Sequence, residues 1–217
     1  MRHYVDNRGP RLARSRVWAG ATALLAVLAV ATGCSSNPAP ASAPSVAAPS
    51  SVVAPGVRAA PLAKSPPIRV QIPAIGVDSP LMELGLQADG TMQVPPTEFP
   101  AGWYTGAPTP GELGPAILAG HVDWAGKPGV FLRLPDLKPD DEVTVARQDG
   151  SAAVFRVTQV KEYPKNEFPT DVVYGDIDHA GLRLITCGGV LNRLAHSYDD
   201  NIIVFADLVG TRTGPSA

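Results

Sequence analysis

The chain has 217 residues, a formal net charge of −2 at pH 7 and 45% hydrophobic residues. Of its 18 basic and 20 acidic residues, 13 and 19 lie beyond residue 34, so this larger part has a net charge of about −6. Such an acidic balance argues against a basic patch that binds nucleic acid or anionic lipid.

The first 34 residues have the pattern of an export signal. Five arginines precede residue 17, and residues 17–32 then contain no charge. A helix of that length spans about 24 Å, which is shorter than the ~30 Å hydrocarbon core of a bilayer. The pattern therefore predicts a signal peptide or membrane anchor over 1–34, with the rest of the chain exported.

The apolar run ends at Cys34, and residues 31–34 resemble a bacterial lipobox, in which the cysteine is acylated. Leucine is usual where Ala31 stands. We expect a lipid on Cys34, and the alternative is an uncleaved signal-anchor helix that contains this cysteine. Both tether the protein to the outer face of a membrane.

Residues 35–67 form a low-complexity segment in which 24 of the 33 residues are Ala, Pro or Ser. Such a composition has too little large apolar surface to fold, which predicts a flexible linker. Proline-rich chain extends about 3.1 Å per residue, so the linker could hold a domain roughly 100 Å from a membrane.

The remaining segment, 68–217, is long enough for one domain with a substantial core. Apolar runs alternate with turn signals and none has the length of an amphipathic helix, which predicts an all-β fold. Residues 202–206 are apolar at successive positions, as in a strand buried on both faces, and this favours a closed barrel over a sandwich. We predict strands at 69–72, 77–84, 92–94, 116–119, 142–146, 153–160, 182–186 and 201–208, and single helical turns at 130–134 and 169–174.

Cys187 is the candidate nucleophile. The apolar run 182–186 is predicted to end at this residue, and the two glycines beyond it leave room for a substrate to approach. The alternative is a buried structural cysteine. A thiol with a nearby imidazole is the minimum needed for acyl transfer through a thioester.

His121 is the candidate acid and base, because it follows the strand predicted at 116–119 and is flanked by Gly120. Asp123 could hydrogen-bond the imidazole or shape the loop. His179 lies in a polar loop and is expected to be solvated, while His196 follows Cys187 and could also reach the thiol.

Arg193 is the candidate oxyanion stabiliser, as the first arginine after Cys187. A guanidinium is always charged at neutral pH and can stabilise the oxyanion that precedes a thioester. The alternative is a solvated loop arginine. Arg183 alternates with Leu182 and Leu184, so it is expected to face solvent or cap the barrel.

Together these residues resemble the sortases, the cysteine transpeptidases of Gram-positive cell surfaces, and among them most closely the class F sortases of actinobacteria. The resemblance covers about residues 68–209. It rests on residues 72–77, 101–104, 114–123, 168–170, 182–189 and 198–201.

The resemblance implies an eight-stranded sortase barrel that cleaves an LPXTG-like sorting signal after Thr. Cys187 would form an acyl-thioester, His121 would exchange protons with the leaving and incoming amines, and a peptidoglycan-precursor amine would resolve the thioester. The implied partners are secreted proteins that bear such signals, at the outer face of a Gram-positive cell membrane. No cofactor, metal or nucleic acid is expected, and the calcium site of some class A sortases cannot be read from the sequence.

The chain departs from the family at the third catalytic position. Many sortases have an arginine immediately before the last strand, whereas residues 199–201 here are Asp-Asp-Asn. Arg193 must then reach in from its loop, or Asn201 supplies a neutral donor. Two other functions compete: an L,D-transpeptidase, whose Ser-His-Gly-Cys motif is absent, and a non-catalytic surface lipoprotein that binds a peptide or ligand.

Overall fold

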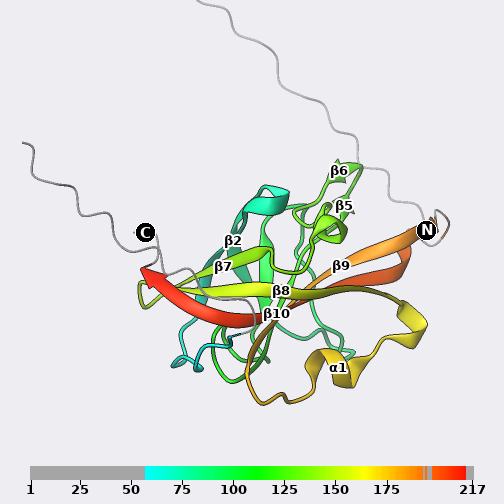
Figure 1. Cartoon of the computed structure of the whole chain (residues 1–217). Helices are drawn as coiled ribbons and strands as arrows, with labels where there is room; N and C mark the ends of the chain where they lie inside the picture. Colours follow the sequence, from blue (N-terminus) through cyan, green and yellow to red (C-terminus); the bar gives the residue numbers. More distant parts are fainter. Residues whose placement is uncertain (1–56, 193, 195–196, 214–217) are drawn as a thin grey trace, which may run out of the picture. The chain divides into compact units, whose positions relative to one another are not determined.

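The computed structural model describes residues 57–192, 194 and 197–213 (Figure 1). The predicted signal segment with Cys34, the first part of the linker and the candidate Arg193 lie outside these residues. Within the described part of the chain, no helix has the length and hydropathy needed to cross a bilayer.

Eight strands close into one barrel in the order β1-β2-β3-β4-β9-β10-β8-β7, which confirms the expected all-β, eight-stranded fold (Figure 1). Two neighbouring pairs, β2 with β3 and β4 with β9, are parallel. The strands are β1 Pro67–Ile72, β2 Val77–Leu84, β3 Ala101–Tyr104, β4 Gly114–Ala119, β7 Glu142–Arg147, β8 Ser151–Pro164, β9 Ala180–Asn192 and β10 Ser197–Thr213.

The other elements are short. A two-stranded ribbon consists of β5 Asp123–Trp124 and β6 Lys127–Pro128. The one α-helix of the described residues, α1, spans Thr170–Tyr174, close to the turn predicted at 169–174. Three 3₁₀ turns complete the set: η1 Pro73–Ile75, η2 Leu134–Asp136 and η3 Lys165–Glu167.

One of the predicted strands is wrong. The strand expected at 92–94 is absent, because Met92 makes only an isolated bridge with Leu86. The eighth strand of the barrel is instead β3, which sequence reasoning did not mark as a strand. The turn expected at 130–134 is present, since the Leu132 amide donates to Gly129 and the Leu134 amide to Phe131, both at 3.1 Å, and η2 follows it.

The barrel has two apolar layers, one inside and one outside. Leu182, Leu184 and Val204 belong to the large inner core. Ile185 and Phe205, which alternate with them, belong to a second cluster on the outer face, covered by the segment around α1. Burial on both faces explains why residues 202–206 are apolar at successive positions.

The chain joins the barrel beside the C-terminal half of β10. The Ala59 amide donates to the Leu208 carbonyl at 2.8 Å, and the Arg58 guanidinium pairs with Asp207 at 2.8 Å. Farther along, the Leu62 amide donates to Gly111 at 2.8 Å. These contacts hold the start of the described chain against the barrel.

Candidate active site

Parallel pairing of β4 with β9 brings the two predicted catalytic side chains to the same level. Ala119 lies opposite Ile185, and the Gly120 amide donates to the Ile185 carbonyl at 3.1 Å. Two residues further along each segment lie His121 and Cys187. Because neighbouring strands are about 4.8 Å apart, this register brings His121 and Cys187 to the same end of the barrel.

Cys187 is a free, half-buried thiol on the outer face of β9. The expectation that the strand ends at this residue is wrong, since β9 continues to Asn192 and pairs with β10 on both sides of an irregularity between Tyr198 and Asp200. Gly189 allows this because it takes a positive φ of 75° and because a Cβ there would overlap the Asp200 carboxylate. The thiol therefore lies within a long two-stranded segment rather than at a loose strand end.

The His121 backbone is anchored to the buried core. The Phe131 amide donates to the His121 carbonyl at 2.9 Å, and the Phe131 side chain is fully buried. Gly129 passes so close that a Cβ would overlap the same carbonyl oxygen. The expected position of His121 after a buried strand is confirmed, and the fold leaves its backbone little freedom.

The His121 ring is held by a backbone carbonyl and an indole. Its Nε2 lies 2.7 Å from the Pro95 carbonyl oxygen, and its centroid is 4.7 Å from the Trp124 ring at 41°. A carbonyl only accepts, so Nε2 carries a hydrogen and donates it. Nδ1 is then the nitrogen available to accept and return a proton.

Tyr198 links the His121 loop to the strand beside Cys187. Its hydroxyl donates to the Asp123 carboxylate, and this hydrogen bond raises the pKa of Tyr198, with smaller contributions from burial and from the nearby Cys187. Asp123 thus shapes the loop through Tyr198. Tyr198 belongs to the motif 198–201 that supports the family resemblance, yet sequence reasoning gave it no role.

Asn201 is the described polar residue best placed beside the thiol. It lies opposite Cys187 in the β9–β10 ladder and is half-buried. Side chains of opposed residues in an antiparallel pair share a face and lie about 5 Å apart at Cβ.

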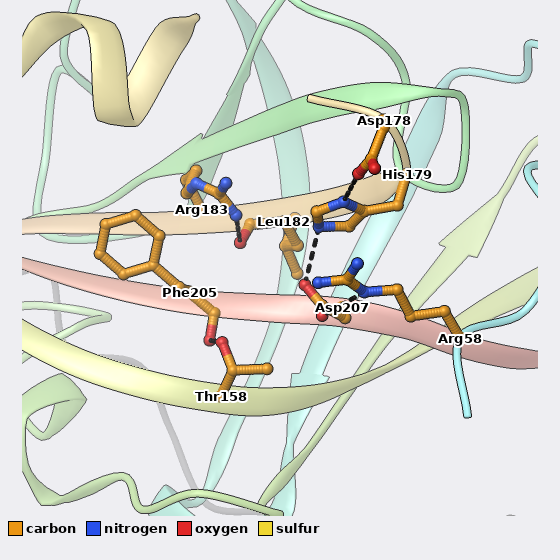
Figure 2. Close-up of polar contacts among 8 residues, drawn as sticks. All are labelled: Arg58, Thr158, Asp178, His179, Leu182, Arg183, Phe205 and Asp207. Atoms are coloured by element: carbon orange, nitrogen blue, oxygen red, sulfur yellow. Dashed lines mark hydrogen bonds and ion pairs between the residues drawn. The ribbon is translucent and has the colours of Figure 1, made fainter. Parts of the chain in front are cut away.

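Arg183 does not face solvent as expected. It is 5% exposed, and its guanidinium stacks over Phe205 at 4.6 Å from the ring centroid (Figure 2). Nη1 donates to the Leu182 carbonyl at 3.2 Å, so the group points back along β9, away from Cys187. Burial lowers the pKa of Arg183, and the charge of Asp207 opposes that effect. This arginine is therefore not an oxyanion donor for Cys187.

His179 is not solvated either, because its side chain is only 16% exposed. Its ring lies between two carboxylates, with Nδ1 2.8 Å from Asp178 and Nε2 3.0 Å from Asp207, which also binds Arg58 (Figure 2). Asp207 lies opposite Gly181, six residues before Cys187 along β9. The cluster therefore belongs to the other end of the barrel.

The described residues offer no group of three or more His, Cys, Asp or Glu side chains arranged to hold a metal ion.

The comparison with protein families decides the identity of this barrel. The family model described as the sortase domain matches residues 70–209. The chain belongs to the sortase family. It is accordingly a cysteine transpeptidase by family, and its free thiol, at the end of the barrel where His121 also lies, fits that chemistry.

Solved sortase structures share the fold at low identity. A lid mutant of sortase A from Corynebacterium diphtheriae matches with a TM-score of 0.53 and 22% identity, covering 68% of this chain and 73% of that one. Sortase C from Streptococcus pneumoniae gives 0.51 and 21%, covering 68% of each chain. Sortase A from Listeria monocytogenes gives 0.52 and 16%, covering 69% of this chain and 92% of that one. No curated protein matches the sequence, and membership of class F stays a prediction.

The hydrogen bond between Tyr198 and Asp123 generates a prediction about positioning. Tyr198→Phe removes the donor, so we expect kcat for peptide cleavage to fall about three- to ten-fold with little change in KM, as for loss of one hydrogen bond. Asp123→Asn keeps an oxygen that can accept and should lose less. Steady-state kinetics with a thermal melt for each variant checks this, and a lower melting temperature with unchanged kcat contradicts it.

Proposed function

We propose that this sortase is a membrane-tethered, extracellular transpeptidase that cleaves an LPXTG-like sorting signal after Thr and transfers the acyl part to a cell-wall amine. The observation that carries the proposal is the β4–β9 register, which pairs Ala119 with Ile185, each two residues before His121 and Cys187. Cys187 lies on the outer face and is half-buried, whereas the inner face is filled by the core.

The first half of the reaction forms a thioester. The Cys187 proton passes to Nδ1 of His121, and Sγ attacks the threonine carbonyl carbon to give a tetrahedral oxyanion. The oxyanion collapses, the peptide C–N bond breaks, and His121 returns the proton to the leaving amine.

The second half releases the acyl group. An incoming amine attacks the thioester carbon while Nδ1 of His121 takes a proton from it, and the C–S bond then breaks. The proton returns to Cys187, so the protein ends unchanged and one amide has replaced another. The Pro95 carbonyl holds the tautomer that leaves Nδ1 free in both halves.

Both halves pass through an oxyanion that needs a donor. Asn201 is opposite Cys187 in register and can donate a neutral hydrogen bond from its amide. Arg193 lies in the segment that connects β9 to β10 and could supply a charged donor. Arg183 is excluded as this donor by its stacking on Phe205.

The N-terminal sequence and the family together support the proposed location. Sortases act at the Gram-positive cell surface, and the arginines before residue 17 favour export of the chain beyond the apolar run. We propose that a lipid on Cys34, or alternatively a signal-anchor helix, holds the enzyme at the outer face of an actinobacterial membrane.

Thiol chemistry tests the proposed reaction. Incubation with an LPXTG-type peptide should give a Cys187 adduct by intact-protein mass spectrometry, and Cys187→Ala should abolish both the adduct and peptide cleavage. The matched control is Thr186→Ser, which keeps a hydroxyl at the buried position next to the thiol. Equal cleavage by Cys187→Ala and the parent contradicts the proposal and favours a non-catalytic lipoprotein.

The donor assignment gives a separate prediction. Arg193→Ala should lower kcat by about 10²–10³-fold, the usual loss on removing one oxyanion donor. Asn201→Ala should then have the smaller effect. Single-turnover rates of thioester formation measure both, and the reverse order assigns the donor to Asn201.

The anchor is tested on full-length protein extracted from membranes. We expect an intact mass that corresponds to a chain beginning at a diacylglyceryl-modified Cys34. The control is Cys34→Ser, which should remain unprocessed. An intact Met1 terminus in the parent protein contradicts the lipid anchor and supports the signal-anchor helix.

A further inference from the structure

Trp124 packs its indole against the ring of His121, at the end of the barrel where Cys187 also lies. The two ring centroids are 4.7 Å apart and the ring planes are tilted by 41°. Trp124 is 40% exposed and belongs to neither apolar cluster of the barrel. Core packing therefore does not explain why this residue lies where it does.

The β5–β6 ribbon fixes the place of Trp124. In the ribbon, Trp124 lies opposite Lys127, whose Nζ pairs with the Glu98 carboxylate at 3.1 Å. Just after the ribbon, the Val130 amide donates to the Glu98 carbonyl at 3.0 Å, and the Val130 side chain packs against the inner core. Because an exposed ion pair contributes little, the backbone hydrogen bond is the main attachment of the ribbon to segment 95–98.

Segment 95–98 also supplies the hydrogen-bond partner of the imidazole. Pro95 is buried, and its carbonyl oxygen lies 2.7 Å from Nε2 of His121. The ring is therefore held at two points, at one nitrogen by the carbonyl and on its ring by the indole of Trp124. Both points belong to one connected unit, because Glu98 joins the segment to the ribbon. Rotation of the ring away from this position would break both contacts together.

The charged and titratable groups around the imidazole have partners of their own. On the ribbon, Asp123 accepts from the Tyr198 hydroxyl of β10, and Lys127 pairs with Glu98. On β9, Cys187 is the group with which the proposed reaction exchanges a proton. The two ring contacts themselves, a carbonyl and an indole, are neutral. Within the described residues, a charge on the ring is thus met by a carbonyl dipole and an aromatic face.

The proposed reaction places a charge on this ring. After Cys187 attacks the substrate, His121 carries a second ring proton for as long as the oxyanion persists. An imidazolium is attracted to an indole when it lies within about 6 Å of the indole centroid, whereas the neutral ring gains less from the same contact. The hydrogen bond from Nε2 to the Pro95 carbonyl is also stronger when the donor is charged. Both contacts therefore favour the charged ring.

We propose that Trp124 is a positioning residue of this sortase, which holds the His121 ring at a fixed tilt and stabilises its charged form in both halves of the reaction. The inference rests on the proposed transpeptidation, in which His121 accepts and returns the proton. It gives the β5–β6 ribbon a role in catalysis, because the ribbon carries the indole to the imidazole.

The charge of the ring is measured by NMR titration of the full-length protein in detergent, with 15N in its histidine side chains. The chain has four histidines, and His121→Gln identifies the signal. Trp124→Leu removes the indole and keeps apolar bulk, so the pH at which half of this ring is charged should fall by about half a unit. Trp124→Phe keeps an aromatic face and should restore most of the parent value.

Steady-state cleavage of an LPXTG-type peptide gives the second readout. Trp124→Leu should lower kcat about three- to ten-fold with little change in KM, and Trp124→Phe should stay within about two-fold of the parent. The matched control is Leu132→Ala, which removes a 45% exposed apolar side chain from the turn after the ribbon. This variant should keep the parent kcat and the parent imidazole titration.

An unchanged titration and an unchanged kcat in Trp124→Leu overturn the positioning role. Equal losses in Trp124→Leu and Trp124→Phe also overturn it, because the aromatic face would then be irrelevant, and so does a change confined to KM. If the parent does not cleave LPXTG-type peptides, the proposed function fails. The NMR titration still decides in that case whether Trp124 stabilises the charged ring of His121.

Discussion

The parallel pairing of β4 with β9 is the constraint on which the site depends. Antiparallel neighbours place the C-terminal end of one strand beside the N-terminal end of the other, whereas a parallel pair brings both C-terminal ends to the same edge. Side chains along each strand alternate between the two faces, and the ladder ends where Ala119 lies opposite Ile185. The next residues that face outward are therefore His121 and Cys187. The supporting contacts, from Phe131 to the His121 carbonyl and from Tyr198 to Asp123, hold the His121 segment after the ladder has ended.

The outer apolar layer buries the second face of the same strands. In a sheet with one solvated face, the residues that alternate with Leu182 and Leu184 would be polar. Here Ile185 and Phe205 are buried beneath the α1 segment, so one side of β9 closes the core while the other is covered by that segment as far as Ile185. Cys187 lies on this second side, where a polypeptide can reach it without any opening of the barrel.

Local patterns predicted most strands and the two main catalytic side chains, because apolar runs and flanking glycines are local signals. Partnerships between distant residues could not be predicted in this way. The Pro95 carbonyl that holds His121 is 26 residues away in sequence, and Tyr198 is 75 residues from Asp123. Arg183 was misplaced because alternation suggests a solvated opposite face, whereas α1 and its neighbours cover that face. The short strand β3 was missed because its four residues include a glycine and its partner β2 is parallel and distant.

The chain joins the barrel far from its chemistry. Arg58 and Ala59 contact Asp207 and Leu208, which lie about 20 to 23 Å along β10 from Asn201. A mechanical pull on the preceding chain would load this ion pair and hydrogen bond first, and then the long β8–β10 ladder in shear. If the proposed N-terminal tether holds the protein, a force on it would thus act at the end of the barrel opposite Cys187.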